Sequence, residues 1–423
     1  MEHASMSEKI LRTIETTIKN DSLLSDFTII PVANNAENRS PVLYENHHFG
    51  LESWCVRYIY DYACSKLFEA RRSLAQKKIS FSLKDDLNYL IVGALLINPD
   101  VPTFWNMKRE LVEDNVLSLE EELTFSRLVL THKPKSNEVF SYRRWLINRK
   151  LFKPLLPSAE IILMHELYVC TQTAENTPNN YHSWIHRQWV VTKFYKYISN
   201  LITAELDMNK FWISRHISES CGYHYRQFLL NQLKLHNNLL SLNIKFYLKN
   251  VLWHFRIQHC DDPEHFLIYL LGEPAKNNTI KDLSRFTHYV IYIFKELSYT
   301  MNIDVMNQVH EPYWLHRRYI LHELLEASHK YLGQEFSPGQ NLNTIQLNKT
   351  ESIMNNIDCE EKQPKIFKTQ PSESQWTSSN MFRIMGIVEK DFIEANIRAG
   401  GVQCEYANKH KRWLKYMMKF EIR

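Results

Sequence analysis

One candidate for anion chemistry is Lys135, which directly follows Pro134 in the string KPKSNEVF. The pattern places this lysine beside the start of a helix, where unpaired backbone N–H groups and the helix dipole favour an anion. An ammonium held there would add a positive charge to that helix start and so favour an anion further. The alternative is a solvated surface lysine, because such strings are common at loop tips.

Histidine is abundant, with 19 copies, but its spacing does not complete a metal site. His182 and His186 have the i,i+4 spacing of two ligands on one helix face, yet no HExxH string occurs and no cysteine stands close to them. The 7 cysteines are far apart, odd in number and without a CxxC pair, which is typical of reduced thiols. We therefore expect no metal in this chain and a reducing compartment.

The composition narrows the fold class. Glycine contributes only 9 of 423 residues, about 2% against roughly 7% in average proteins. Doubly wound sheets and barrels use glycine in turns, phosphate loops and bulges, so its scarcity favours helices. Neither GxGxxG nor GxxxxGK[ST] occurs, which argues against nucleotide binding through a glycine loop.

The charge and the hydropathy of the sequence predict a cytoplasmic protein that has no nucleic-acid partner. The formal charge of +4 is spread along the chain, which is too weak to imply nucleic acid. The first twenty residues lack the apolar core of a signal peptide, and no uncharged run is long enough for a transmembrane segment. The closing KFEIR is not a prenylation box.

Five segments share one pattern, with an aromatic residue at position 0, basic or glutamine side chains at +3 and +4, and an apolar residue at +6. The aromatic and basic residues that mark the copies are Trp105 and Arg109, Phe140 and Arg144, Trp184 and Arg187, Tyr223 and Arg226, and Trp314 and Arg317. The aromatics are 35, 44, 39 and 91 residues apart. The first three intervals suit helical-hairpin repeats of roughly 34 to 47 residues.

Two further sites are weaker copies. Within the long interval, Trp253 with Arg256 is the best candidate for a degenerate repeat. Near the end, KRWL from Lys411 echoes the RRWL that begins at Arg143, but Asn408 occupies its aromatic position.

Each copy follows an apolar-periodic stretch and a short break, so we expect an antiparallel helix pair as the unit. Capping strings support two helix starts, Ser82 with Asp85 and Ser118 with Glu121. Positions 0, +3, +4 and +7 share one helix face. The simpler interpretation is architectural: the aromatics pack between hairpins, and the guanidinium groups stack on them or bind carbonyls of a neighbouring unit. A repeat that reads a ligand varies its contact residues from unit to unit, whereas this pattern keeps them fixed.

The pattern resembles the protein prenyltransferase α-subunit repeat over about half of the chain, most specifically in NNYHSWIHRQWVV from Asn179 to Val191. The resemblance implies an all-α, right-handed superhelical solenoid of helical hairpins that wraps around a separate β subunit. In that family the β subunit holds the catalytic zinc and the isoprenoid pocket, so zinc is expected in the partner and an isoprenoid diphosphate as co-substrate.

The resemblance also assigns site residues. Lys135 matches the family lysine that approaches the isoprenoid diphosphate. Tyr181 and His182 match the family pair near the mouth of the active site, where a phenol can donate a hydrogen bond. A buried tyrosine that fills the hairpin turn is the alternative for Tyr181. At Asn137 the family has a tyrosine, and this departure points to a different acceptor.

The chain is expected to divide into four parts. They are an N-terminal arm over 1–50, the repeat array over 51–332, a loop rich in polar residues over 333–379, and C-terminal capping helices over 380–423. The segment from Leu51 to Arg72 reads as a helix that covers the end of the array. The basic closing helix suits the same capping role better than contact with anionic lipid.

We therefore expect the α subunit of a heterodimeric protein geranylgeranyltransferase, inactive by itself. By the resemblance, its partner is the β subunit of Rab geranylgeranyltransferase, and its acceptor is a protein with a cysteine near the C-terminus, such as an already farnesylated SNARE. The alternative is a non-enzymatic helical-repeat scaffold, which would need no anion-facing lysine. A repeat-type RNA reader is less consistent with the weak charge and the fixed pattern.

Overall fold

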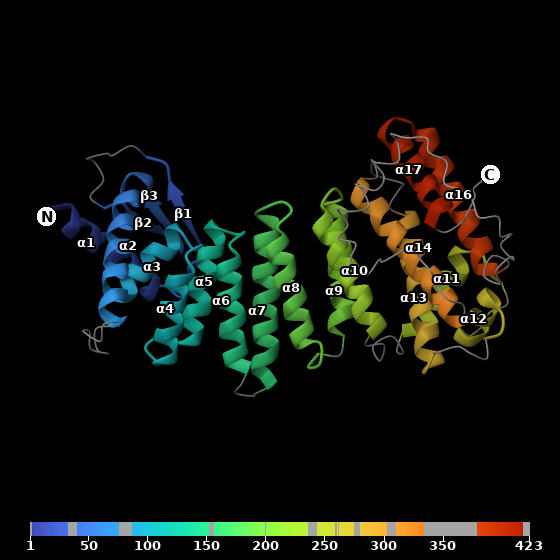
Figure 1. Cartoon of the computed structure of the whole chain (residues 1–423), viewed down its shortest axis with the longest axis horizontal. Coiled ribbons are helices and arrows are strands. Elements are labelled where there is room, and N and C mark those ends of the chain that lie inside the picture. The colour runs from blue at the N-terminus through green and yellow to red at the C-terminus, as the bar shows by residue number, and fades with distance from the viewer. Residues whose placement is uncertain are drawn as a thin grey trace. The chain divides into compact units, whose positions relative to one another are not determined.

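The structure, a computed structural model, describes residues 2–32, 40–75, 87–151, 156–198, 200–235, 243–258, 260, 262–274, 280–302, 310–333 and 379–417. The chain divides into two compact units, residues 1–201 and 202–423, and each is described by itself. Helices dominate both units in Figure 1, which confirms the predicted all-α helical-repeat class.

The first unit begins with elements that the sequence did not indicate. Helix α1 (Glu2–Asn20) precedes a three-stranded sheet of β1 (Asp26–Ile30), β2 (Val42–Glu45) and β3 (His48–Glu52). The strand order is β1-β3-β2, with β1 parallel and β2 antiparallel to β3. These elements replace the N-terminal arm predicted for residues 1–50. Each strand has only four or five residues, too few for period-2 alternation to stand out.

The sheet is attached to the helical part of the unit through α5 (Leu119–His132). The backbone N–H of Phe27 donates to Thr131 Oγ1 at 2.9 Å. Arg127 donates to the carbonyls of Leu24 and Ser25. The first strand is therefore held by polar contacts with a helix more than a hundred residues away in sequence.

The rest of the first unit consists of helices. They are α2 (Ser53–Ala75), α3 (Asn88–Ile97), α4 (Pro102–Glu113), α6 (Asn137–Leu151), α7 (Leu156–Glu175) and α8 (Tyr181–Phe194). Consecutive helices pair as α3 with α4, α5 with α6 and α7 with α8, and Figure 1 shows the last two pairs side by side. Among the first helices, α5 contacts both α3 and α7, and among the second helices, α6 contacts both α4 and α8. The unit is thus a two-layered stack of hairpins.

Local signals explain where several of these helices start. Ser118 and Glu121 form the predicted capping box at the start of α5. Asn180 caps α8 by accepting a hydrogen bond from the backbone N–H of Ser183. Pro102 occupies the first turn of α4, where no backbone donor is lost. The other predicted capping string, Ser82 with Asp85, lies outside the described residues.

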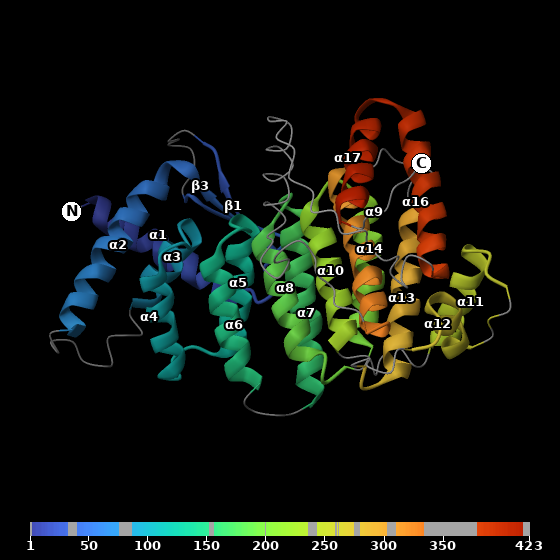
Figure 2. The same ribbon diagram turned by 45° about the vertical axis from the view of Figure 1, so that its right-hand side comes forward.

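The second unit contains further helical hairpins and an inserted pair of helices, α11 and α12. Its helices are α9 (Leu201–Arg215), α10 (Ser220–Leu235), α11 (Ile244–His254), α12 (Pro263–Leu271), α13 (Leu283–Asn302), α14 (Glu311–Tyr331), α16 (Asn380–Ala399) and α17 (Gly401–Met417). The pairs α13 with α14 and α16 with α17 pack as hairpins, and α10 and α17 both contact α14. Helices α11 and α12 stand between α10 and α13 in sequence, and Figure 2 shows them at the edge of this unit.

Two glycines mark the end of α16. The helix stops at Ala399, and Gly400 and Gly401 both have positive φ, which glycine adopts without strain. Helix α17 then returns against α16 and α14. The polar loop predicted over 333–379 lies, apart from its two end residues, outside the described part of the chain.

Candidate functional site

At one edge of the first unit, hydrogen bonds connect the turns that precede the second helices of neighbouring hairpins. The Asn180 amide donates to the Pro134 carbonyl at 2.7 Å and to the Thr173 carbonyl at 3.0 Å. Ser136 in turn donates to Asp100 Oδ1 at 2.6 Å, in the turn before α4. Because α4, α6 and α8 all begin here, this edge gathers three helix N-termini with their unpaired N–H groups.

The four residues assigned by the resemblance all lie at this edge. Lys135 is exposed in the turn before α6, and Asn137 is the exposed first residue of that helix. Tyr181 begins α8 with 57% of its surface exposed, so it does not fill the hairpin turn. His182 is half-buried, and its ring meets the Tyr181 ring edge-on at 5.9 Å. The hydrogen bond between Asn180 and Pro134 joins the turn that carries Lys135 to the start of α8.

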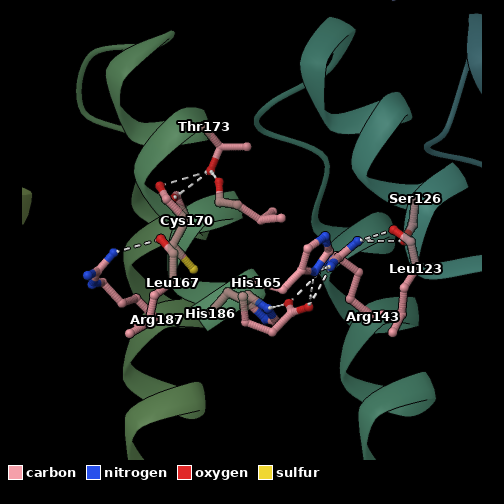
Figure 3. A network of polar contacts seen from close by, with 12 residues as sticks. Leu123, Ser126, Arg143, His165, Leu167, Cys170, Thr173, His186 and Arg187 are labelled. Carbon is pink, nitrogen blue, oxygen red and sulfur yellow. Dashed lines mark hydrogen bonds and ion pairs between the residues drawn. The ribbon is translucent and has the colours of Figure 1, made fainter. Parts of the chain in front are cut away.

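The +3 position of the repeat belongs to a buried cluster centred on a glutamate (Figure 3). Arg143 on α6 meets Glu166 on α7 with Nε to Oε2 at 3.1 Å and Nη2 to Oε1 at 2.5 Å. His186 on α8 reaches the same carboxylate with Nε2 to Oε2 at 2.9 Å. All three side chains are fully buried. We call this arrangement a Glu-centred cluster. It consists of a cation at +3 on the second helix of one hairpin, a glutamate on the first helix of the following hairpin, and the residue at +2 on the second helix of that following hairpin.

Each cation also binds the first helix of its own hairpin. Arg143 Nη1 donates to the Leu123 carbonyl at 2.7 Å and to Ser126 Oγ at 2.8 Å. Arg187 repeats this arrangement, donating to the Leu167 carbonyl at 3.1 Å (Figure 3). The guanidinium groups therefore bind carbonyls of their own hairpin, and not those of a neighbouring unit as the architectural interpretation expected. The link to the next hairpin is the buried ion pair with Glu166.

The same cluster recurs in both units. Lys108, Glu122 and Tyr142 form it in the first unit, with Lys108 Nζ 2.7 Å and the Tyr142 hydroxyl 2.8 Å from the carboxylate. The described residues of the second unit form two copies, Arg226 with Glu296 and His316, and Arg317 with Glu389 and His410. Each copy joins three helices, so these clusters define the repeat in three dimensions.

Burial and charge set the protonation of these clusters. Burial by itself raises the pKa of Glu166, but the Arg143 charge and the hydrogen bonds from His165 and His186 hold that pKa well below its usual value. Burial lowers the pKa of His186 and outweighs the nearby carboxylate. Its Nδ1 has no hydrogen-bond partner among the described residues. A neutral ring that donates from Nε2 leaves only a lone pair there, whereas an imidazolium would bury an unsatisfied N–H.

The structure distinguishes the +3 and +4 positions, which the sequence pattern had grouped. Arg109 and Arg144 lie at +4 and are half-buried, whereas the fully buried cations of the same copies are Lys108 and Arg143. The helical period places +3 against the next hairpin, while +4 turns toward the surface of the second-helix layer. The +3 residues Arg187, Arg226 and Arg317 are buried as their position requires. The marker aromatics Trp105, Phe140, Trp184, Tyr223 and Trp314 are all buried.

Trp253 is not a degenerate repeat. It is 83% exposed near the end of α11, and Arg256 follows the helix with φ of 53°. The long interval instead reflects the inserted α11 and α12, because Arg226 finds its glutamate on α13, 70 residues later. Conversely, the weak echo at the C-terminus is a structural copy. His410 stands at +2 from Asn408 and occupies the histidine place of the last cluster, with Nε2 2.7 Å from Glu389 Oε2.

The acidic member of the cluster is the residue that sequence reasoning missed. Its signal is a glutamate 20 or 21 residues before the +2 residue, as in Glu166 with His186 and Glu389 with His410. A second regular feature is an aromatic at +5 that stacks on the +2 ring. The stacked pairs are Tyr142 with Trp145, His186 with Trp189, Tyr225 with Phe228, His316 with Tyr319, and His410 with Trp413.

His182 and His186 do not form a metal site together. His186 is committed to Glu166, so it does not face His182 as a second ligand. The described residues offer one group with suitable spacing, His322, Glu323 and Glu326. Its two carboxylates already bind the Lys234 ammonium at 3.0 and 2.9 Å. A dication there would have to displace this lysine.

The fold and the clusters define a helical-repeat protein whose hairpins are joined by the same kind of buried Glu-centred cluster. A family model, protein prenyltransferase alpha subunit repeat, matches residues 119–150 and 163–194, which cover most of the α5–α6 and α7–α8 hairpins. Protein prenyltransferase alpha subunit repeat-containing protein 1-A of Xenopus laevis is 30% identical over 338 residues, 75% of this chain and 73% of the relative. The human protein prenyltransferase alpha subunit repeat-containing protein 1 is 27% identical over 335 residues, 76% and 78% of the two chains.

The chain belongs to the protein prenyltransferase alpha subunit repeat-containing protein family. It is also similar to the geranylgeranyl transferase type-2 subunit alpha of Rattus norvegicus, with 29% identity over 178 residues, 40% of this chain and 29% of the relative. Membership in this family indicates a transferase-associated subunit. Within the described residues, no helix is both long enough and apolar enough to cross a membrane.

Proposed function

We propose that this chain is the α subunit of a heterodimeric protein geranylgeranyltransferase. A cysteine thiolate near the C-terminus of an acceptor protein attacks the first carbon of geranylgeranyl diphosphate. A carbon–sulfur bond forms, the carbon–oxygen bond breaks, and diphosphate leaves with the bonding electrons. The partner is a prenyltransferase β subunit, with that of Rab geranylgeranyltransferase as the first candidate. The β subunit would hold zinc, which activates the thiolate, together with most of the isoprenoid.

The observation that carries this proposal is the edge where α4, α6 and α8 begin. Three helix N-termini point their dipoles the same way there, and the Asn180 hydrogen bond to Pro134 joins two of the turns. Lys135 adds a full positive charge and Tyr181 an exposed hydroxyl to this edge. A diphosphate that gains charge as its bond breaks is the kind of group that such an edge stabilises.

The chain's own residues would then act on the leaving group and not on the thiolate. Lys135 would stabilise developing charge on the diphosphate, and the Tyr181 hydroxyl would donate a hydrogen bond to it or to its neighbours. His182 and Asn137, on the first turns of α8 and α6, would contact the acceptor. An asparagine at 137 offers a shorter, more polar contact than a tyrosine, in keeping with an unusual acceptor such as an already farnesylated SNARE.

A non-enzymatic scaffold is the other function this fold could serve. Hairpin arrays bind proteins over wide surfaces without any chemistry. That function gives no reason for an exposed lysine and tyrosine on two joined helix starts, and the family similarity to a geranylgeranyl transferase subunit also speaks for the enzyme.

Co-expression with a prenyltransferase β subunit tests the assembly. We expect a stable heterodimer in size-exclusion chromatography, transfer of geranylgeranyl to an acceptor detected by mass spectrometry, and no transfer by the chain alone. Failure to form a complex with any such β subunit would favour the scaffold.

Replacing Lys135 tests the site. Lys135→Ala should lower kcat/KM by about tenfold or more, equivalent to about 1.4 kcal/mol of transition-state stabilisation, and leave the heterodimer intact. Lys133→Ala is the matched control, because Lys133 is exposed in the same turn but ends α5 instead of preceding α6. Equal activity of both variants and the wild type would remove the assignment of Lys135.

A further inference from the structure

The inserted helix α11 carries an exposed aromatic and basic face that the repeat architecture does not require. Its buried side, Ile244, Leu248 and Val251, packs toward α13. On the opposite side, Phe246 is 62% exposed and Trp253 is 83% exposed. These two residues are seven apart, so their rings lie on one stripe of the helix, two turns from each other.

Cations flank the two rings. Lys249 stands between them, at +3 from Phe246 and −4 from Trp253, and therefore shares their stripe. Lys245 borders the stripe on the same side, and Arg256 follows the helix two residues after its end. None of the three cations forms an ion pair with any residue that the structure describes.

The helix contains no acidic residue. Its sequence IKFYLKNVLWH has two lysines and no Asp or Glu, so the charge on this face has one sign. The insertion also leaves the Glu-centred cluster intact, since Arg226 still meets Glu296 across the 70 residues that include α11 and α12. The exposed rings are thus not needed to join α10 to α13. Figure 2 shows α11 at the outer edge of its unit.

We propose that the face formed by Lys245, Phe246, Lys249, Trp253 and Arg256, here named the α11 face, binds the surface of a membrane containing anionic phospholipids. Tryptophan and phenylalanine favour the boundary between headgroups and acyl chains, and lysines beside them are attracted to anionic headgroups. The face lies on a single convex helix, which offers no pocket to recognise one side chain of a protein. A fluid lipid surface needs no such pocket.

This inference goes beyond the proposed transferase activity and does not depend on it. Membrane contact through α11 would hold the full chain near lipidated or lipid-bound proteins whatever its catalytic role. The contact is shallow and reversible, because two rings and three cations give less binding than a spanning or lipid-anchored segment.

Vesicle flotation with the full-length chain tests the proposal. We expect it to float with vesicles of phosphatidylcholine and phosphatidylserine, and to bind pure phosphatidylcholine far more weakly. Binding should fall as salt rises, because the headgroup charge is screened. Phe246→Ser combined with Trp253→Ser should weaken binding to the anionic vesicles by about tenfold or more. Lys245→Glu combined with Lys249→Glu should weaken it by roughly fivefold for each residue.

Matched controls exist on α16. Ile387 is 58% exposed and Lys390 is exposed one turn later, so this pair repeats the apolar and cationic chemistry at a different place. Ile387→Ser combined with Lys390→Glu should leave vesicle binding within about twofold of the wild type, as expected for residues away from the bound face. Circular dichroism shows whether every variant keeps its helices.

Three results would overturn the proposal. One is a wild-type chain that ignores anionic vesicles, and another is an α11 variant that binds them as tightly as the wild type. The third is a photo-crosslinker at position 253 that captures a polypeptide and no lipid when both are present, which would make the face a protein interface.

Discussion

Neutralising Glu166 should destabilise the first unit far more than neutralising an exposed glutamate. Glu166→Gln keeps the shape of the side chain but removes the charge that faces the buried Arg143, whose Nη2 lies 2.5 Å from Oε1. The guanidinium then faces neutral acceptors alone, among them the Leu123 carbonyl, the Ser126 hydroxyl and the amide oxygen of the introduced glutamine. Breaking a fully buried pair in this way costs about 3 to 5 kcal/mol.

The matched control is Glu113→Gln. Glu113 also pairs with an arginine, Arg149, but the two side chains are 47% and 45% exposed. An exposed ion pair contributes about 0 to 1 kcal/mol, because solvent screens it. The structure therefore predicts a difference of several kcal/mol between two chemically identical substitutions.

Two assays measure the effect. Urea unfolding followed by circular dichroism gives the loss for the whole chain, and hydrogen exchange with mass spectrometry gives the local opening of α7 and α8. Local exchange matters because a chain of two units need not unfold in one step. The double variant Arg143→Met with Glu166→Met should lose less than the sum of its single variants, since it leaves no charge buried alone. Equal, small losses for Glu166→Gln and Glu113→Gln would refute the reasoning.

The remaining predictions concern pH and packing. Burial lowers the pKa of His186, His316 and His410 from the usual 6.5, so the unfolded chain binds protons first as the pH falls. Stability should therefore be complete above about pH 6.5 and decline below it, as measured by melting temperature against pH. A melting temperature that stays constant as the pH falls below 6.5 would contradict neutral buried rings. In α10, Gly222→Ala would place a Cβ 2.7 Å from Trp212 Cζ3. It should cost about 1 to 3 kcal/mol, and an unchanged melting temperature would show that the indole moves freely.

Much of the helical-hairpin repeat could be predicted from the sequence because its signals are local. The 3.6-residue period, the capping box of Ser118 and Glu121, and the glycines at 400 and 401 act within a few residues of the chain. The placement of Lys135 beside a helix start followed from a local signal of the same kind, the preceding Pro134. That Lys135 and Tyr181 stand at one edge came from the structure, in which the Asn180 bond joins their turns.

The misplaced repeat shows why the rest was harder. Trp253 has the right residue type and the right basic neighbour, yet it lies on the exposed side of α11. Asn408 has the wrong residue type, yet its helix supplies His410 to a buried cluster. A repeat position is defined by what it packs against, so a pattern of residue types along one helix cannot separate these two cases. The N-terminal strands were missed because their runs are short, and because β1 pairs with β3, whose residues lie 22 positions later in the chain.

The sequence by itself determined the helical class, the hairpin unit and some helix ends, because each depends on the preferences of neighbouring residues. The candidate anion-binding residues came from the family resemblance and stay a prediction. Only the tertiary structure decided which cation of each copy is buried, which glutamate neutralises it, and which aromatic faces solvent. Arg226 and Glu296 are 70 residues apart, and no local preference pairs them. Desolvation makes such a pair obligatory once α10 and α13 pack together, so the pairing follows from the packing and not from the spacing.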